Sequence, residues 1–255
     1  MATDNLKDGQ FLLGLSVGTG YTIGQAEFAM LQGAKKRRDS DPNKVSMDPA
    51  NFNIVQFGDL SEKLRTEGIK NLSEIEAQRP KYSDRVESYK TLLNYLQGDP
   101  DRVEMHRRLN TVDPTTELSN RLGYYLASEG RDQLALPEGY KRLFIFADCD
   151  HMKHWNEVSK GSYAETTRHI CAIGQGIQAS TRQEEEEEEE EDTKHERRAT
   201  DVSESKLRDL VIATRVHGET GDEFLLDVFC PPDQIIPIAQ RIIATAYQKQ
   251  LDLYK

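Results

Sequence analysis

The chain has 255 residues, of which 36% are hydrophobic and 30% are charged, a composition typical of a water-soluble protein with a modest core. Its net charge is −11, but eight glutamates and one aspartate at 184–192 contribute −9, so the remaining −2 offers no basic surface for DNA. No apolar stretch approaches the roughly 20 residues of a membrane-spanning helix, and the first residues lack a signal-peptide pattern; we therefore expect a cytoplasmic protein that contacts no membrane.

The N-terminal region, residues 1–105, gives few structural signals. Its glycine-punctuated run at 18–24 fits no standard phosphate-binding fingerprint, so we interpret it as a plain turn. Farther along, apolar residues three and four positions apart predict an amphipathic helix over 83–96, and a second helix is expected over 102–109. These residues would form a mainly helical regulatory or dimerisation region with a connecting helix. Ordinary packing within the chain is an equally open interpretation.

Residues 106–255 carry the signals of a second unit. The apolar run at 141–147, between a Pro-Glu-Gly turn and acidic residues, predicts a buried strand. It is followed by a helix over 164–179, strands over 209–215 and 224–229, and a helix over 233–251. An acidic insertion at about 181–205 interrupts this unit, because consecutive glutamates repel one another and cannot pack. The order of strand, helix, hairpin and helix predicts an α+β fold arranged as an α/β sandwich.

Two pairs of acidic residues are predicted to meet at one edge of the sheet. Asp148 and Asp150 follow the strand at 141–147, and Asp222 and Glu223 lie in the turn of the later hairpin. In a β-α-β-β arrangement the first strand lies beside the hairpin, so these carboxylates converge. A divalent cation would relieve their repulsion, and ligands that are all oxygen favour Mg²⁺ or Mn²⁺. Lys153 follows one turn later, where its charge would meet a triphosphate.

Three segments, in order, resemble the motifs of GGDEF domains. Residues 113–121 (DPTTELSNR) look like the family's opening Asp-x-Leu-Thr-Gly-Leu-x-Asn-Arg. Residues 148–156 (DCDHMKHWN) are similar to its Asp-x-Asp-x-Phe-Lys-x-x-Asn motif, and residues 220–224 (TGDEF) resemble the signature that names the family. The resemblance covers residues from about 110 to 250.

The resemblance implies a ferredoxin-like palm of the nucleotide-cyclase type and the activity of a diguanylate cyclase. Such an enzyme joins two GTP molecules into cyclic di-GMP with Mg²⁺ or Mn²⁺, across a homodimer of two half-sites. By position, the metal ligands would be Asp148, Asp222 and the backbone carbonyl of Cys149. Asp222 and Glu223 would be the catalytic residues, Lys153 would contact phosphates, and Asn156 and Glu165 would recognise guanine.

The chain departs from the family pattern in several places, including Thr115 for Leu and Glu117 for Gly in the opening motif. Thr220 replaces the first glycine of the signature, and the segment between Arg215 and Asp222 is longer than the usual turn. The sequence also ends after the helix at 233–251, where family members continue with another strand, a helix and further basic phosphate contacts. We hypothesise that the segment around 12–17 supplies the missing strand.

Other functions stay open at the level of sequence. The departures are compatible with a degenerate, catalytically inactive module that binds GTP or a protein partner. A third hypothesis is a scaffold whose acidic run at 184–192 engages basic proteins. The sequence does not decide between GTP and ATP, because related palm cyclases use ATP.

Overall fold

The structure is a computed structural model that describes residues 11–37, 53–158, 163–181, 211–216 and 221–255. The acidic run at 184–192 and Thr220, both singled out in the sequence, lie outside these described residues. Among the residues described, no helix is both long enough and apolar enough to cross a membrane.

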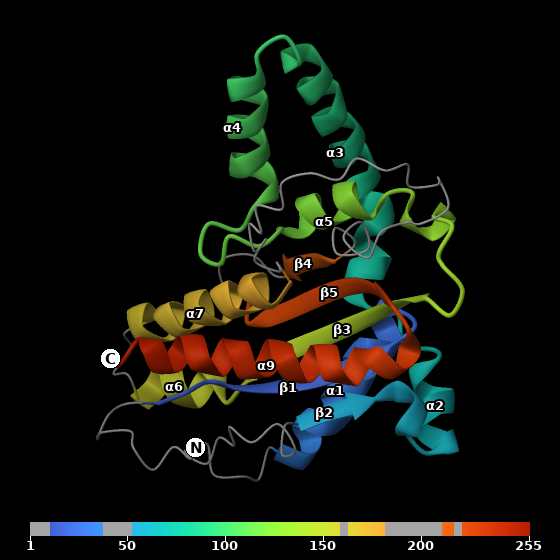
Figure 1. The fold of residues 1–255 in the computed structure, drawn as a ribbon, viewed down its shortest axis with the longest axis vertical. Coiled ribbons are helices and arrows are strands. Elements are labelled where there is room, and N and C mark those ends of the chain that lie inside the picture. Colours follow the sequence, from blue (N-terminus) through green and yellow to red (C-terminus); the bar gives the residue numbers. More distant parts are fainter. Residues whose placement is uncertain (1–10, 38–52, 159–162, 182–210, 217–220) are drawn as a thin grey trace, which may run out of the picture.

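A five-stranded sheet forms the centre of the molecule, with its strands in the order β2-β1-β3-β5-β4 (Figure 1). The strands are β1 (Gly14–Gly20), β2 (Asn53–Gln56), β3 (Lys141–Asp150), β4 (Ile212–Arg215) and β5 (Glu223–Cys230). β1 and β2 run parallel, whereas the pairs β1–β3, β3–β5 and β4–β5 are antiparallel. The sheet is therefore mixed, and the fold is compatible with the predicted α+β class.

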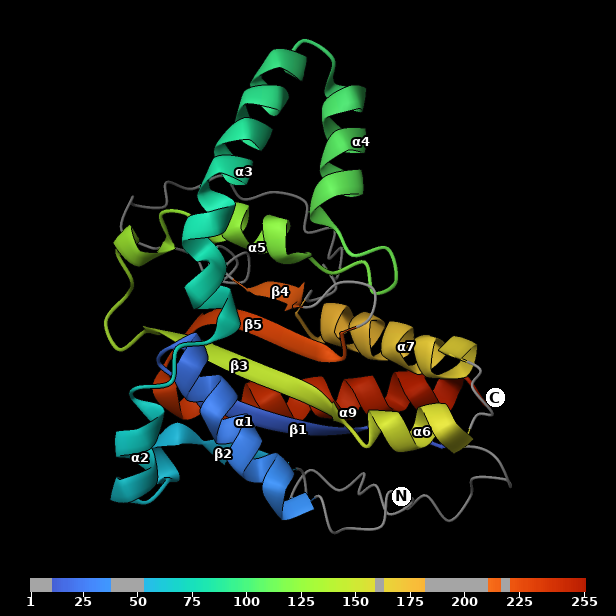
Figure 2. The same ribbon diagram turned by 180° about the vertical axis from the view of Figure 1, so that it is seen from behind.

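Helices cover both faces of this sheet (Figures 1 and 2). On one face α7 (Tyr163–Thr181) packs against α9 (Ile235–Asp252). On the other lie α1 (Ile23–Arg37), α3 (Glu74–Leu96) and α5 (Arg121–Ser128). The remaining helices are α2 (Glu62–Gly68), α4 (Pro100–Thr111) and α6 (Met152–Val158), with short 3₁₀ turns at Phe57–Asp59, Arg131–Gln133 and Pro232–Gln234.

The central strand β3 explains why its sequence is almost continuously apolar. Leu143 and Ile145 point to the face covered by α7 and α9, whereas Phe144 and Phe146 point to the face covered by α1, α3 and α5. A strand buried on both faces needs apolar residues at odd and even positions alike. The prediction of a buried strand at 141–147 is confirmed, and the strand continues to Asp150.

The N-terminal region contributes two strands to the sheet. β1 pairs with β3 along its whole length, from Gly14 opposite Asp150 to Gly20 opposite Phe144. The segment around 12–17 thus contributes a strand, which runs from Gly14 to Gly20, and the sheet extends across the boundary predicted at residue 105. That this strand replaces the one missing from the family pattern stays a hypothesis.

The glycine run at 18–24 is not the plain turn predicted from the sequence. Its first residues end β1, and Gly24 lies in α1. A Cβ atom on Gly18 would lie 2.1 Å from the carbonyl oxygen of Ala26 and 2.2 Å from the amide nitrogen of Met30. Glycine is needed at residue 18 because α1 crosses directly over the strand, so its role is packing.

Helices α3 and α4 form a hairpin that projects away from the sheet (Figures 1 and 2). α3 begins earlier than predicted because Ser73 and Glu76 form a reciprocal capping box at its N-terminus. Asp99 caps α4, and Pro100 occupies its first turn. Tyr95 is 86% exposed and Leu109 is 72% exposed, so apolar side chains of this hairpin face outward.

The two ends of the described chain meet beside α7. The hydroxyl of Tyr254 donates to the carbonyl oxygen of Phe11 at 3.0 Å, and Gln250 exchanges hydrogen bonds with the backbone of Leu13 at 2.8 and 3.1 Å. Phe11 also stacks on Trp155 of α6, with ring centroids 4.3 Å apart. These contacts fix the start of β1 against the last turns of α9.

Candidate metal centre

Three of the four predicted carboxylates meet at one end of the sheet. Asp148 lies near the C-terminal end of β3, directly opposite Glu223 at the start of β5. One carboxylate oxygen each from Asp148, Asp222 and Glu223 lies within 4.8 Å of the others, and all three residues are partly buried. The convergence predicted from the strand order is confirmed for these residues.

Backbone hydrogen bonds hold the carboxylate turn, by which we mean residues 221–223, which carries two of these carboxylates. The amide of Cys149 donates to the carbonyl oxygen of Asp222 at 3.2 Å, and the amide of Val216 donates to that of Glu223 at 3.0 Å. The amide of Asp222 also donates to a carboxylate oxygen of Glu223 at 3.1 Å. The positions of the acidic side chains therefore follow from pairing of β5 with its two neighbours.

The electrostatics of the site favour binding of a cation. Burial, reinforced by the charges of Asp222, Glu223 and Asp150, raises the pKa of Asp148 to about 8. In the absence of a cation, Asp148 would therefore hold a proton near neutral pH. A metal ion supplies the positive charge that this group of carboxylates lacks.

Asp150, the second acid of the Asp-x-Asp pair, does not join this cluster. Its carboxylate accepts a hydrogen bond of 2.5 Å from the hydroxyl of Ser16, which is fully buried in β1. The side chain of Asn53 in turn donates to the Ser16 hydroxyl at 2.7 Å. Sequence reasoning missed Ser16 and Asn53, because more than 90 residues separate them from Asp150 and no local pattern links them.

Cys149 lies between the two aspartates but faces the opposite way. Its side chain is buried in the core on the α7 and α9 face, and burial raises the pKa of its thiol. The thiol is therefore a packing group. The role of the Cys149 backbone carbonyl as a metal ligand stays a prediction.

The chain reverses sharply between β3 and α6. His151 adopts a left-handed conformation with φ of 60°, which is uncommon for a residue other than glycine and often marks a functional turn. Lys153 then lies in the first turn of α6, three residues beyond Asp150, and its side chain is exposed. The structure thus places an exposed cationic side chain shortly after the carboxylate strand.

The two residues expected to recognise guanine lie near the junction of α6 and α7. Asn156 in α6 accepts a hydrogen bond of 2.8 Å from the hydroxyl of Thr166 in α7. Glu165, the residue before Thr166 in α7, forms an ion pair of 3.0 Å with Arg168 and lies 3.9 Å from His169. Asn156 and Glu165 are therefore brought to the same junction, each with a partner from α7.

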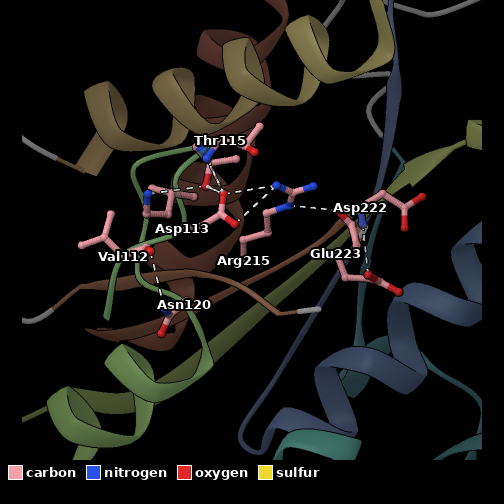
Figure 3. A network of polar contacts seen from close by, with 10 residues as sticks. Val112, Asp113, Thr115, Asn120, Arg215, Asp222 and Glu223 are labelled. Atoms are coloured by element: carbon pink, nitrogen blue, oxygen red, sulfur yellow. Dashed lines mark hydrogen bonds and ion pairs between the residues drawn. The ribbon is translucent and has the colours of Figure 1, made fainter. Parts of the chain in front are cut away.

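The opening segment of the GGDEF resemblance forms a buried anchor. Asp113 is 1% exposed and pairs with Arg215 of β4, which is 2% exposed (Figure 3). Arg215 also donates to the carbonyl oxygen of Gly221, the residue before Asp222. Sequence reasoning assigned Arg215 no role, and the available signal was one arginine at the end of a short strand.

The donor set fits a hard divalent cation. Mg²⁺ and Mn²⁺ prefer carboxylate oxygen ligands, and octahedral coordination of Mg²⁺ separates opposite ligands by about 4.2 Å. The oxygens of Asp148, Asp222 and Glu223 lie within 4.8 Å of one another, so the three side chains would have to draw closer to reach the roughly 3–4 Å that separates ligands of one such ion. The side chains present are thus suited to holding such an ion.

Comparison with known proteins gives no family assignment. No family model, no curated protein and no solved structure matches the chain. Interpretation of the site therefore depends on its own geometry and on the motif resemblance.

Proposed function

We propose that the chain is a metal-dependent nucleotide cyclase of the diguanylate cyclase type, which condenses two GTP molecules into cyclic di-GMP in the cytoplasm. The observation that carries the proposal is the cluster of Asp148, Asp222 and Glu223 at one end of the sheet. These residues occupy the motif positions at which the GGDEF resemblance expects metal ligands and catalytic carboxylates.

In this reaction the 3′ hydroxyl of one GTP attacks the α-phosphorus of the other, and pyrophosphate leaves. The same step in the opposite direction closes the ring and releases a second pyrophosphate. Mg²⁺ or Mn²⁺, when bound, activates the attacking hydroxyl and stabilises charge on the phosphates. Asp148 and Asp222 would hold the ion, and Glu223 would accept the proton that the attacking hydroxyl loses.

The other predicted residues position the nucleotide. Lys153 contacts the phosphates from the first turn of α6, because a flexible ammonium group suits a triphosphate. Asn156 and Glu165 contact the guanine edge from the junction of α6 and α7. Each chain then holds one GTP, and a second copy of the chain supplies the other half-site.

Family members continue after the helix that corresponds to α9 with another strand and helix, and β1 and α1 would take the place of these two elements. β1 lies beside β3, and α1 follows it, so a strand and a helix from the other end of the chain occupy that side of the sheet. Contact of Tyr254 with Phe11 brings the end of α9 to the start of β1. Such an order would be that of a circularly permuted palm, and it supports the cyclase proposal.

The direct test is incubation of the purified full chain with GTP or ATP and Mg²⁺ or Mn²⁺, with products separated by chromatography. We expect cyclic di-GMP from GTP, and none from Asp222→Ala. Glu157→Gln is the matched control, because Glu157 is an exposed acid of α6 and its substitution should leave the product unchanged.

Two outcomes would change the assignment. GTP binding without product under any of these conditions would favour the degenerate, inactive module, for which Thr220 is the sequence argument. A cyclic product from ATP alone would keep the chemistry but contradict the assigned nucleotide.

A further inference from the structure

A buried ion pair connects the carboxylate turn to the base of the α3–α4 hairpin. We propose that Arg215, anchored by Asp113, is a positioning residue that sets the place of Asp222 and thereby the affinity of the metal centre. This inference rests on the proposed function, because it concerns the regulation of that same site.

Arg215 holds the turn through a direct hydrogen bond. Its Nε donates to the carbonyl oxygen of Gly221 at 2.9 Å, and Gly221 immediately precedes Asp222. From the other side, the amide of Cys149 donates to the carbonyl oxygen of Asp222 at 3.2 Å. The turn is therefore held between a side chain of β4 and the backbone of β3, as Figure 3 shows for the Arg215 side.

The guanidinium is in turn fixed by Asp113. Its Nη1 donates to the two carboxylate oxygens of Asp113 at 3.1 and 3.4 Å. Both side chains are almost fully buried, so water cannot replace either partner. Loss of the pair would leave one buried charge uncompensated and free the turn to shift.

Asp113 itself has little freedom to move. One of its carboxylate oxygens accepts from the amides of Thr115 and Thr116, at 3.2 and 2.9 Å, and from the Thr116 hydroxyl at 2.8 Å. Its backbone amide donates to Leu118 at 2.8 Å. Because α4 ends at Thr111, the position of Asp113 follows the end of the hairpin, and a shift there would be passed to Asp222.

A second buried ion pair in the same sheet provides a matched comparison. Asp227 lies four residues after Glu223 on β5 and pairs with Arg142 at 2.6 Å. This pair stands opposite Phe144 and Ile212, away from the carboxylate turn. Substitution of Arg142 therefore removes an arginine from a buried pair without releasing Gly221.

The experiment compares Mn²⁺ titrations of the full-length wild-type chain with those of Arg215→Met, Arg215→Lys, Asp113→Asn and Arg142→Met. We expect Arg215→Met to weaken Mn²⁺ binding by about tenfold or more, the usual effect of removing a residue that orients a metal ligand. Arg215→Lys should recover part of this loss, because an ammonium keeps the charge but cannot bridge both partners. Asp113→Asn tests the anchor if Arg215→Met does not fold.

Arg142→Met should lower stability but leave the Mn²⁺ affinity within about twofold, because distant sites act independently. Equal Mn²⁺ affinities of folded Arg215→Met and wild type would overturn the inference. An equally large loss of affinity in Arg142→Met would also overturn it, since the effect would then reflect general destabilisation.

A measurement without metal separates this inference from the proposed function. Amide hydrogen exchange in peptides containing residues 221–224 should accelerate in Arg215→Met and stay near wild type in Arg142→Met. If wild type binds no Mn²⁺, the proposed function fails, whereas unchanged exchange in Arg215→Met contradicts the positioning role itself.

Discussion

β5 carries two acidic sites that differ in what neutralises them. Near the middle of this strand Asp227 is fully buried and is contacted by Arg142 at 2.6 Å and by Arg131 at 3.4 Å. At its beginning Glu223 lies on the same face of the strand but meets two further carboxylates, Asp148 and Asp222. Two acidic residues, four positions apart, thus lie in opposite electrostatic settings.

This difference distinguishes a structural charge from one available to a ligand. Two arginines satisfy Asp227 within the chain, so it stabilises the sheet and leaves nothing for an external cation to bind. The cluster at the start of β5 concentrates negative charge, and burial together with these charges raises the pKa of Asp148 to about 8. A perturbed carboxylate among others of its kind is typical of functional sites.

The largest expected effect is the loss of stability on substitution of Asp227, in the middle of β5. Asp227→Ala would leave Arg131 and Arg142 without their buried partner, and we expect the free energy of unfolding to fall by about 3–5 kcal/mol. Chemical denaturation measures this loss. The Mn²⁺ affinity of the folded fraction should be unchanged. A large loss of affinity would show that Asp227 and the carboxylate cluster are not independent.

The next effect is on activity at the carboxylate end. Asp222→Asn keeps the size of the side chain but removes a charge from the cluster, so the rate of product formation should fall by roughly 100-fold or more. Thermal unfolding of the metal-free protein should change little. Retention of most activity would exclude Asp222 as a metal ligand.

A smaller effect concerns the pH dependence of the metal-free protein. Asp148 has a pKa of about 8 in the folded protein but near 3.8 in the unfolded chain. The stability that Asp148 contributes is therefore complete below pH 3.8, and it is lost as the pH rises toward 8. Asp148→Asn should remove this loss, and the variant should be more stable than wild type by about 1–3 kcal/mol at pH 8. Denaturation curves at pH 5 and pH 8 test this.

Two further results would show whether ionisation of Asp148 causes the difference in stability between wild type and Asp148→Asn. The gap between wild type and Asp148→Asn should shrink at pH 5, where Asp148 is protonated in the folded protein, and also when Mn²⁺ is added to wild type. A gap that is constant across this pH range would mean that ionisation of Asp148 is not its cause.

The smallest effect is expected at Asp150, which lies beside the cluster but is bonded within the chain. Ser16→Ala removes the hydroxyl that donates to Asp150 and should cost about 1 kcal/mol of stability. Mn²⁺ affinity should stay within about twofold if the two sites are independent. A loss of affinity as large as that of Asp222→Asn would place Asp150 in the metal centre.

Much of the local structure could be predicted from the sequence. The apolar run before Asp148 predicted β3, and the spacing of apolar residues predicted α7, α9 and the last part of α3. The clustering of Asp148 with Asp222 and Glu223 followed from strand order, because a strand and a following hairpin tend to be neighbours. These inferences use patterns that lie within about 20 residues or follow common connection rules.

The sequence by itself determined the periodic elements and the acidic residues at their ends, since side-chain periodicity reflects burial directly. Only the tertiary structure decided that β1 lies beside β3, that Asp150 bonds to Ser16, and that Arg215 joins Asp113 to the carboxylate turn. Each of these contacts links residues about 100 or more positions apart. Such contacts leave no local pattern, because they depend on packing of the whole sheet and its two layers of helices.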